Sequence, residues 1–287
     1  MTALQTSPTA SAAVRSRRRR IRPPWGLVLS IVFLALVVLA AIAPALLAPF
    51  SPTVQDLSDP LGAPSLAHWF GTDQAGRDLY SRVVWGTRES LLIGVGAAAI
   101  ALVLAIVFGS LASLTDRFTS TVVSRVLEIA FAFPVLLLAL LLVAILGPSA
   151  WTEVLAIGIS SAPGYARMVR GQILAARESG YVEAARALGH SRRRIVRQHI
   201  LPNAMRPLIA IFTMAIGQSI VWASGLAFLG LGTPPPSSEW GALLDAGREY
   251  LLLAPWLTFL PGLVILLLAL AATTVGKHIQ SYVEKGE

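Results

Sequence analysis

Long apolar stretches alternate with shorter polar segments along most of this chain. Six stretches are apolar enough, and at about 20 residues long enough, to cross a hydrocarbon core of about 30 Å as helices. They are residues 27–49, 90–114, 122–146, 152–169, 207–231 and 255–276. The pattern therefore predicts an all-α membrane protein with six transmembrane helices.

The fourth stretch is the weakest of the six, because Glu153, Pro163 and Gly164 interrupt it. It is retained because of where the basic residues fall. Six arginines lie in residues 15–22 and nine more lie between Arg167 and Arg206. Basic residues favour cytoplasmic loops, and six spans place both clusters on one side. We therefore expect both termini to be cytoplasmic.

Composition agrees with this class, since 55% of the 287 residues are hydrophobic and only 13% are charged. The net charge of +8 comes from basic residues that flank apolar spans, which indicates a lipid bilayer as partner and argues against nucleic acid. The chain has no cysteine, which excludes disulfides and thiolate metal sites. Its four histidines have no metal-ligand spacing, so no metal or other cofactor is expected in this chain.

The polar segments divide the chain into three parts. Residues 1–22 are predicted to be a disordered basic tail, residues 23–276 the six-span domain, and residues 277–287 a cytoplasmic tail. Within the domain we expect an external segment at 50–86, a cytoplasmic loop at 170–206 and an external loop at 232–254. A cleaved signal peptide competes for the first span, but an apolar stretch of more than 20 residues favours an uncleaved anchor.

Two features of the spans have alternative interpretations. Small residues recur every four positions in the second span, which indicates close helix packing within this subunit, or a face that lies against a partner subunit or along the pathway. They are Ala97, Ala101, Ala105, Gly109 and Ser113. In the third span, Glu128 follows Arg125 by three residues, and is either half of a structural ion pair or a gating element.

Residues 181–203 form a polar segment that predicts two short helices joined by a tight turn. One face of the first helix is expected to carry Tyr181, Ala184, Ala185 and Leu188. Gly189 can adopt the left-handed conformation that ends a helix.

The second short helix is expected to begin at Ser191, which can act as its N-cap. Its apolar strip would consist of Ile195, Val196, His199 and Ile200. Pro202 is predicted to stop this helix, and Pro207 to open the fifth span.

The same segment resembles a known family. Glu183-Ala184-Ala185, Gly189, Ile200 and Leu201-Pro202 are similar to the "EAA" motif of permease subunits of ATP-binding-cassette importers. In that family the motif inserts into a groove on a cytoplasmic ATPase. The resemblance implies a coupling site made of Glu183, Ala184, Ala185, Leu188, Gly189, Ile200, Leu201 and Pro202.

Further motifs resemble the "C"-type permeases of dipeptide and oligopeptide importers, over roughly residues 27–275. These motifs are His68, Gly71-Thr72-Asp73, Gly76-Arg77-Asp78, Ser81-Arg82, Gly86, Ser90-Leu91, Gly94, Phe228-Leu229-Gly230-Leu231-Gly232, Pro235-Pro236 and Trp240-Gly241. Ala223, Glu128 and the tail that begins Gly276-Lys277 depart from the family pattern.

This resemblance implies a complex in a bacterial cytoplasmic membrane. Its other members would be a second, different permease chain, two cytoplasmic ATPase subunits that bind ATP and magnesium, and an external solute-binding protein. Docking of that protein is expected on residues 50–86 and 232–254, with Asp73, Arg77, Asp78 and Trp240 as candidates. Peptides are the favoured cargo, with nickel, glutathione and haem left open.

Two absences in the sequence favour an external motor. The chain has no Gly-x-x-x-x-Gly-Lys-Ser/Thr phosphate loop, so no ATPase activity of its own is expected. Its spans also have no paired carboxylates or broken-helix repeats of the kind found in ion-coupled carriers. A motor-independent carrier or channel remains an alternative, as does a membrane enzyme, although His68, Asp73 and Asp78 are better interpreted as loop structure.

Overall fold

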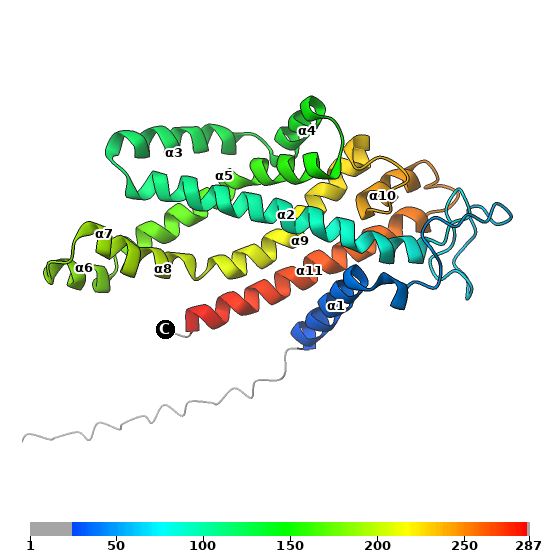
Figure 1. Cartoon of the computed structure of the whole chain (residues 1–287), viewed down its shortest axis with the longest axis horizontal. Helices are drawn as coiled ribbons and strands as arrows, with labels where there is room; N and C mark the ends of the chain where they lie inside the picture. Colours follow the sequence, from blue (N-terminus) through cyan, green and yellow to red (C-terminus); the bar gives the residue numbers. More distant parts are fainter. Residues whose placement is uncertain (1–24, 286–287) are drawn as a thin grey trace, which may run out of the picture.

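A computed structural model describes residues 25–285, and in this part of the chain every element of regular secondary structure is a helix (Figure 1). The elements are α1 (Trp25–Ile42), η1 (Pro44–Leu46), α2 (Leu79–Leu114), α3 (Arg117–Ala132), α4 (Val135–Leu146), α5 (Ala150–Arg177), α6 (Gly180–Ala187), α7 (Arg192–Ile195), η2 (Val196–Ile200), α8 (Leu201–Met205), α9 (Leu208–Leu226), η3 (Ala227–Leu231), α10 (Trp240–Arg248) and α11 (Trp256–Lys285). The all-α prediction is confirmed for these residues. The predicted tail at 1–22 lies outside them.

Four helical segments are long and apolar enough to cross a membrane, namely α1, α2, α9 together with η3, and α11. They match the predicted first, second, fifth and sixth spans. Two of these helices end at other residues than predicted. Helix α1 ends at Ile42, before Pro44, whereas α11 continues past residue 276 to Lys285, so the predicted tail begins inside a helix.

The predicted third span is not one continuous helix. Helices α3 and α4 meet at a bend of 91°. The break falls at Phe133 and Pro134, where Phe133 is extended with ψ 133°. Proline disfavours the helical conformation in the residue before it, which divides the predicted third span. By length and composition, the described residues contain four apolar spans, or five if the bent pair is counted as one.

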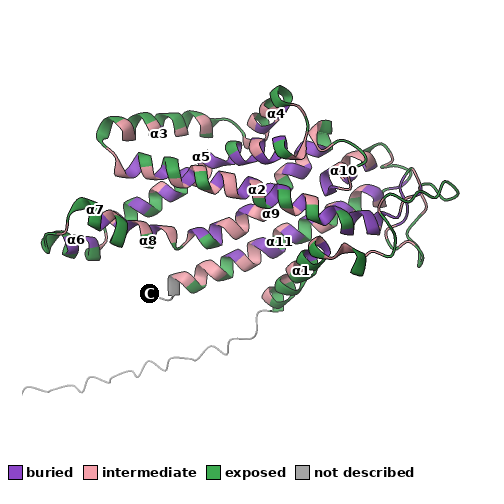
Figure 2. Ribbon diagram, viewed as in Figure 1, coloured by how far each residue is buried: buried purple, intermediate pink, exposed green. Residues whose placement is uncertain are grey.

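The predicted fourth span lies within α5, which runs unbroken through Pro163. With 28 residues it is roughly 42 Å long, although it is not among the helices apolar enough to be counted as spans. Most of its first half is buried, and its main neighbour is α2 (Figure 2). A helix sheltered by other helices can carry Ser, Thr and Glu where a lipid-facing helix would not.

The small-residue stripe of α2 packs against α5. A Cβ placed on Gly109 would lie 2.8 Å from Val169 Cγ1 and 2.9 Å from Ala166 O, so only glycine fits there. Ala97, Ala101 and Ala105 are completely buried. Of the two interpretations of the stripe, packing within this subunit is therefore the one observed.

The long helices lie alongside one another and leave distinct structures at the two ends (Figure 1). At one end lie the segment between α1 and α2, together with α10. At the other end the short helices α6 and α7 project beyond the bundle. The candidate site residues fall into these two groups.

Candidate functional site

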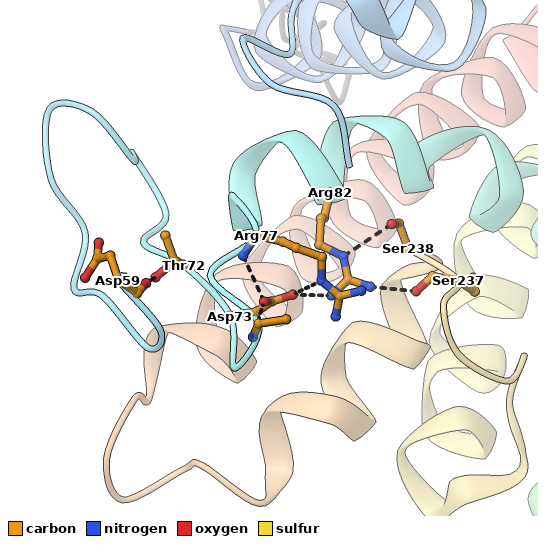
Figure 3. A network of polar contacts seen from close by, with 8 residues as sticks. Asp59, Thr72, Asp73, Arg77, Arg82, Ser237 and Ser238 are labelled. Atoms are coloured by element: carbon orange, nitrogen blue, oxygen red, sulfur yellow. Dashed lines mark hydrogen bonds and ion pairs between the residues drawn. The ribbon is translucent and has the colours of Figure 1, made fainter. Parts of the chain in front are cut away.

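At the end of the bundle that carries α10, which the sequence predicts to be external and which is called the outer end below, Asp73 is the centre of a buried polar network (Figure 3). Its Oδ1 accepts hydrogen bonds from the backbone N–H groups of Ala75 at 2.8 Å and Arg77 at 3.0 Å. Its Oδ2 forms ion pairs with Arg77 Nε and with Arg82 Nη1, both at 2.7 Å. One carboxylate thus fixes the tight turn before α2 and the first turns of α2 itself.

Arg82 connects this turn to the last external loop. Its Nη2 donates to Ser237 O at 2.8 Å, and its Nε to Ser238 Oγ at 3.4 Å. Gly86, one turn further along α2, allows the close approach, because a Cβ there would overlap Ser238 O. Segments about 155 residues apart in sequence are therefore held together by one buried guanidinium.

The loop then enters α10 through Glu239 and Trp240, both buried. Glu239 caps α10 by accepting from Ala242 N at 2.8 Å and also accepts from Ser90 Oγ at 3.0 Å. Burial raises the pKa of Glu239, although the backbone N–H groups of α10 oppose the shift. Trp240 Nε1 donates to Val83 O at 2.9 Å, which joins α10 to α2.

These contacts bear on the prediction that Asp73, Arg77, Asp78 and Trp240 are docking residues. The side chains of Asp73, Asp78 and Trp240 are buried, and that of Arg77 is mostly buried. Asp78 caps α2 by accepting from Ser81 N and pairs with His68 Nδ1 at 2.9 Å. Sequence position could not distinguish a charge on the surface from one bonded inside the loop.

At the other end, α6 and α7 are joined by a left-handed turn at Gly189, whose φ is 75°. Apart from its two neighbours, no described residue lies within 4 Å of a Cβ built at this glycine, so backbone conformation alone selects it. Ser191 Oγ accepts from Arg194 N at 3.4 Å and caps α7. The predicted turn and N-cap are confirmed.

The buried face of α6 differs from the prediction. Val182 and Ala185 face the body of the protein, whereas Tyr181, Ala184 and Leu188 are exposed. Leu188 is 76% exposed. The apolar residues of α6 therefore point in two directions, inward to the protein and outward from it.

The second half of the segment is buried as predicted at Ile195 and Ile200. Pro202 does not end the helix, which is a correction. The chain passes through the π-helical turn η2 into α8, and Pro202 occupies the first turn of α8, where its missing N–H is not needed. The helical path continues to Met205.

Two arginines that the motif did not single out attach this segment to the bundle. Arg177 donates to Ser113 O, and Arg192 donates to Leu114 O at 2.7 Å. Both carbonyls lie at the end of α2, where a helix has unpaired acceptors and a negative dipole end. Partners 64 and 78 positions apart leave no local signal in the sequence.

The predicted ion pair in α3 is also present. Arg125 Nη1 lies 2.7 Å from Glu128 Oε2, and both side chains are well exposed. The structural interpretation of Glu128 is therefore supported by its geometry.

Comparison with known proteins identifies the family. The sequence model of the protein family described as "Binding-protein-dependent transport system inner membrane component" matches residues 101–285. The chain belongs to this family. It is thus a multi-pass permease component of a transport system, and its helices α2 to α11 supply the matched region.

Curated relatives align over nearly the whole chain. The dipeptide transport system permease protein DppC of Alkalihalophilus pseudofirmus is 36% identical, over 95% of this chain and 90% of the relative. The probable D,D-dipeptide transport system permease protein DdpC of Escherichia coli is 40% identical, over 90% and 86%. The glutathione transport system permease protein GsiD of Pectobacterium atrosepticum is 39% identical, over 76% and 72%.

A solved structure shares the fold. An inward-facing conformation of the MetNI methionine ABC transporter matches with a TM-score of 0.58 and 20% identity, and the match covers 70% of this chain and 96% of that chain. At this identity the likeness concerns the arrangement of the helices alone.

Proposed function

We propose that this chain is a membrane subunit of an ATP-driven importer of dipeptides or oligopeptides in a bacterial cytoplasmic membrane. It would pair with a second, different permease chain, with both termini and the α6–α7 end on the cytoplasmic side. The names of relatives aligned over 90% or more of this chain support the peptide cargo. The ATPase activity, with ATP and magnesium, would belong to two partner subunits.

The coupling site is proposed at the helix pair α6–α7. The observation that supports it is an outward surface on α6 that nothing in the described chain covers. This surface includes Glu183, Ala184, Leu188 and Gly189, all exposed. Ile200, Leu201 and Pro202 would act behind it, by fixing the helix pair to α9 as one lever that moves when the ATPases close.

An external solute-binding protein is proposed to dock on residues 50–86 and 232–254. The buried network around Asp73, Arg77, Asp78 and Trp240 would keep that surface in shape without touching the binding protein directly. This role follows from their burial and from the bonds that join the two external segments.

The coupling proposal is tested with Leu188→Glu in the complete complex. Because Leu188 is 76% exposed, the change should leave the permease folded while placing a charge in the ATPase contact. We expect loss of ATPase subunits on co-purification and loss of cargo-stimulated ATP hydrolysis. The matched control for co-purification is Leu252→Glu, since Leu252 is 99% exposed at the opposite end of the bundle. ATP hydrolysis is not compared in this variant, because residues 232–254 are the proposed docking surface of the binding protein. Equal ATPase retention in both variants would refute the coupling site.

Glutathione is the second candidate cargo, because a glutathione permease is among the relatives. Uptake of a labelled dipeptide into vesicles containing the whole complex, with unlabelled glutathione as competitor, separates the two. Strong competition by glutathione would favour the second candidate. Flux in vesicles without ATPase subunits would instead favour a motor-independent carrier.

A further inference from the structure

A cavity of about 440 Å³ separates the end of α2 from the helix pair α6–α7. Its lining includes four basic side chains, Arg177, Arg186, His190 and Arg192, and no acidic side chain. Three separate parts of the chain contribute them, namely the end of α5, the helix α6, and the turn into α7. The cavity thus gathers positive charge that is dispersed in the sequence.

The donors in this cavity are only partly used. Arg177 and Arg192 each give one hydrogen bond to the last carbonyls of α2, whereas a guanidinium has five N–H donors. The side chain of Arg186 has no hydrogen bond or ion pair with any described residue. The buried Nδ1 of His190 also has no partner within the described chain, while its ring stacks on His199 at 5.9 Å. Several guanidinium donors of the three arginines therefore remain without an acceptor at the cavity.

The rest of the lining is aliphatic. Leu114, the last residue of α2, and Ile195 both contribute to it. Under the proposed orientation α2 ends at the cytoplasmic membrane surface, which is the depth of the phospholipid headgroups. Arginine clusters favour phosphate because a guanidinium can donate two parallel hydrogen bonds to it.

We propose that this cavity binds a phosphate group, carried either by an anionic phospholipid headgroup or by a free phosphate anion. Arg177, Arg186 and Arg192 would donate to its oxygens, with His190 as a fourth donor. The bound group would join the end of α2 to the helix pair α6–α7 and so stiffen the proposed lever. Basic cavities between helices on the cytoplasmic side have the chemistry for such headgroups.

A second basic surface provides a control. Arg193, Arg194 and Arg197 line a depression together with Ser191 and Gln198, and all five lie on the path from Ser191 through η2. No aliphatic side chain lines this depression. Arg193 is exposed and carries the same charge on the same short helix as Arg192. Arg193→Gln therefore removes a charge at similar depth without changing the cavity.

The test uses the complete complex in nanodiscs of phosphatidylglycerol or phosphatidylcholine, followed by native mass spectrometry. Wild type is expected to retain phosphatidylglycerol that Arg186→Gln loses, with about tenfold weaker apparent binding, or about 1.4 kcal/mol. Arg193→Gln should match wild type. His190→Phe keeps a ring for the stack and should weaken binding in the same direction. Because Arg186 makes no internal bond, its variant should fold normally.

A titration of inorganic phosphate in phosphatidylcholine nanodiscs distinguishes the two sources. Thermal stabilisation that disappears in Arg186→Gln would assign a free anion, whereas no stabilisation combined with retained phosphatidylglycerol would assign the lipid headgroup. Equal loss of lipid in Arg186→Gln and Arg193→Gln would overturn the proposal, because it would indicate charge without a site. A crosslink showing a partner carboxylate inside the cavity would also overturn it.

Discussion

The two ends of the helix bundle use charged residues in opposite ways. At the outer end, Asp73 and Arg82 are buried and bonded to each other and to the neighbouring loops. At the α6–α7 end, Arg192 is exposed and Arg177 is half-buried, and each bonds to a backbone carbonyl of α2. Charged groups at the outer end are thus paired within the chain. The other end keeps hydrogen-bond donors and apolar side chains available for contact with another molecule.

This difference teaches how to interpret a charged residue in a motif. A charge with several internal partners maintains the shape of a surface, and its removal lowers the free energy of unfolding. A charge with few internal partners is available for contacts with another molecule, and its removal weakens assembly of the complex. Substitutions at the two ends should separate these two outcomes.

The largest expected effect is at Arg82. Arg82→Ala leaves Asp73 buried with one ion pair fewer and frees the carbonyl of Ser237. Breaking a buried pair costs about 3–5 kcal/mol, so the unfolding midpoint in detergent should fall strongly. The matched control is Arg88→Ala, because Arg88 is exposed on the same helix. Similar midpoints for the two variants would remove the distinction between the two ends.

Gly86→Ala should have the next largest effect. The new methyl group would overlap Ser238 O, so the last external loop must move away from α2. We expect a loss of about 1–3 kcal/mol in the free energy of unfolding. Gly171→Ala, in a helix position where a Cβ would meet no described atom beyond its own helix backbone and chain neighbours, should be neutral or stabilising. Unchanged stability in both variants would show that the loop does not pack against α2.

At the opposite end, Gly189→Ala should cost about 1–2 kcal/mol, because alanine is strained at a φ of 75°. Asparagine tolerates this conformation better, so Gly189→Asn should retain more stability. In the complete complex the same ranking should hold for cargo-stimulated ATP hydrolysis. Full ATP hydrolysis in a Gly189→Pro complex would contradict the lever.

The smallest effect is expected at Arg125. Its pair with Glu128 is exposed on both sides, and such pairs contribute less than about 1 kcal/mol. Arg125→Gln should therefore leave the unfolding midpoint nearly unchanged. A large drop would mean that Glu128 has a second role, such as the gating element considered from the sequence.

Sequence pattern predicted four of the spans because α1, α2, α9 and α11 each carry a long apolar run. It failed at Pro134, where a single dihedral restriction turns an apolar run into two helices. It ranked the stretch within α5 as the weakest span. Hydropathy scores side chains as if they faced lipid, whereas α5 is sheltered by α2.

For the site, local chemistry was predictable and tertiary contact was not. Gly189 and Ser191 were identified because a left-handed turn and an N-cap each depend on one residue type. The burial of Trp240 and the bonds from Arg177 and Arg192 to α2 depend on segments distant in sequence. No periodicity within a helix carries that information.

The sequence separation of 155 residues between Arg82 and Ser237 has a consequence for biosynthesis. A ribosome adding about 5–20 residues per second reaches Ser237 roughly 8–30 s after Arg82. During that interval the nascent α2 has its Asp73 pair but no partner for the remaining guanidinium donors. Insertion machinery or solvent must accommodate this charge until the last external loop emerges, so the outer end of the protein is completed late in translation.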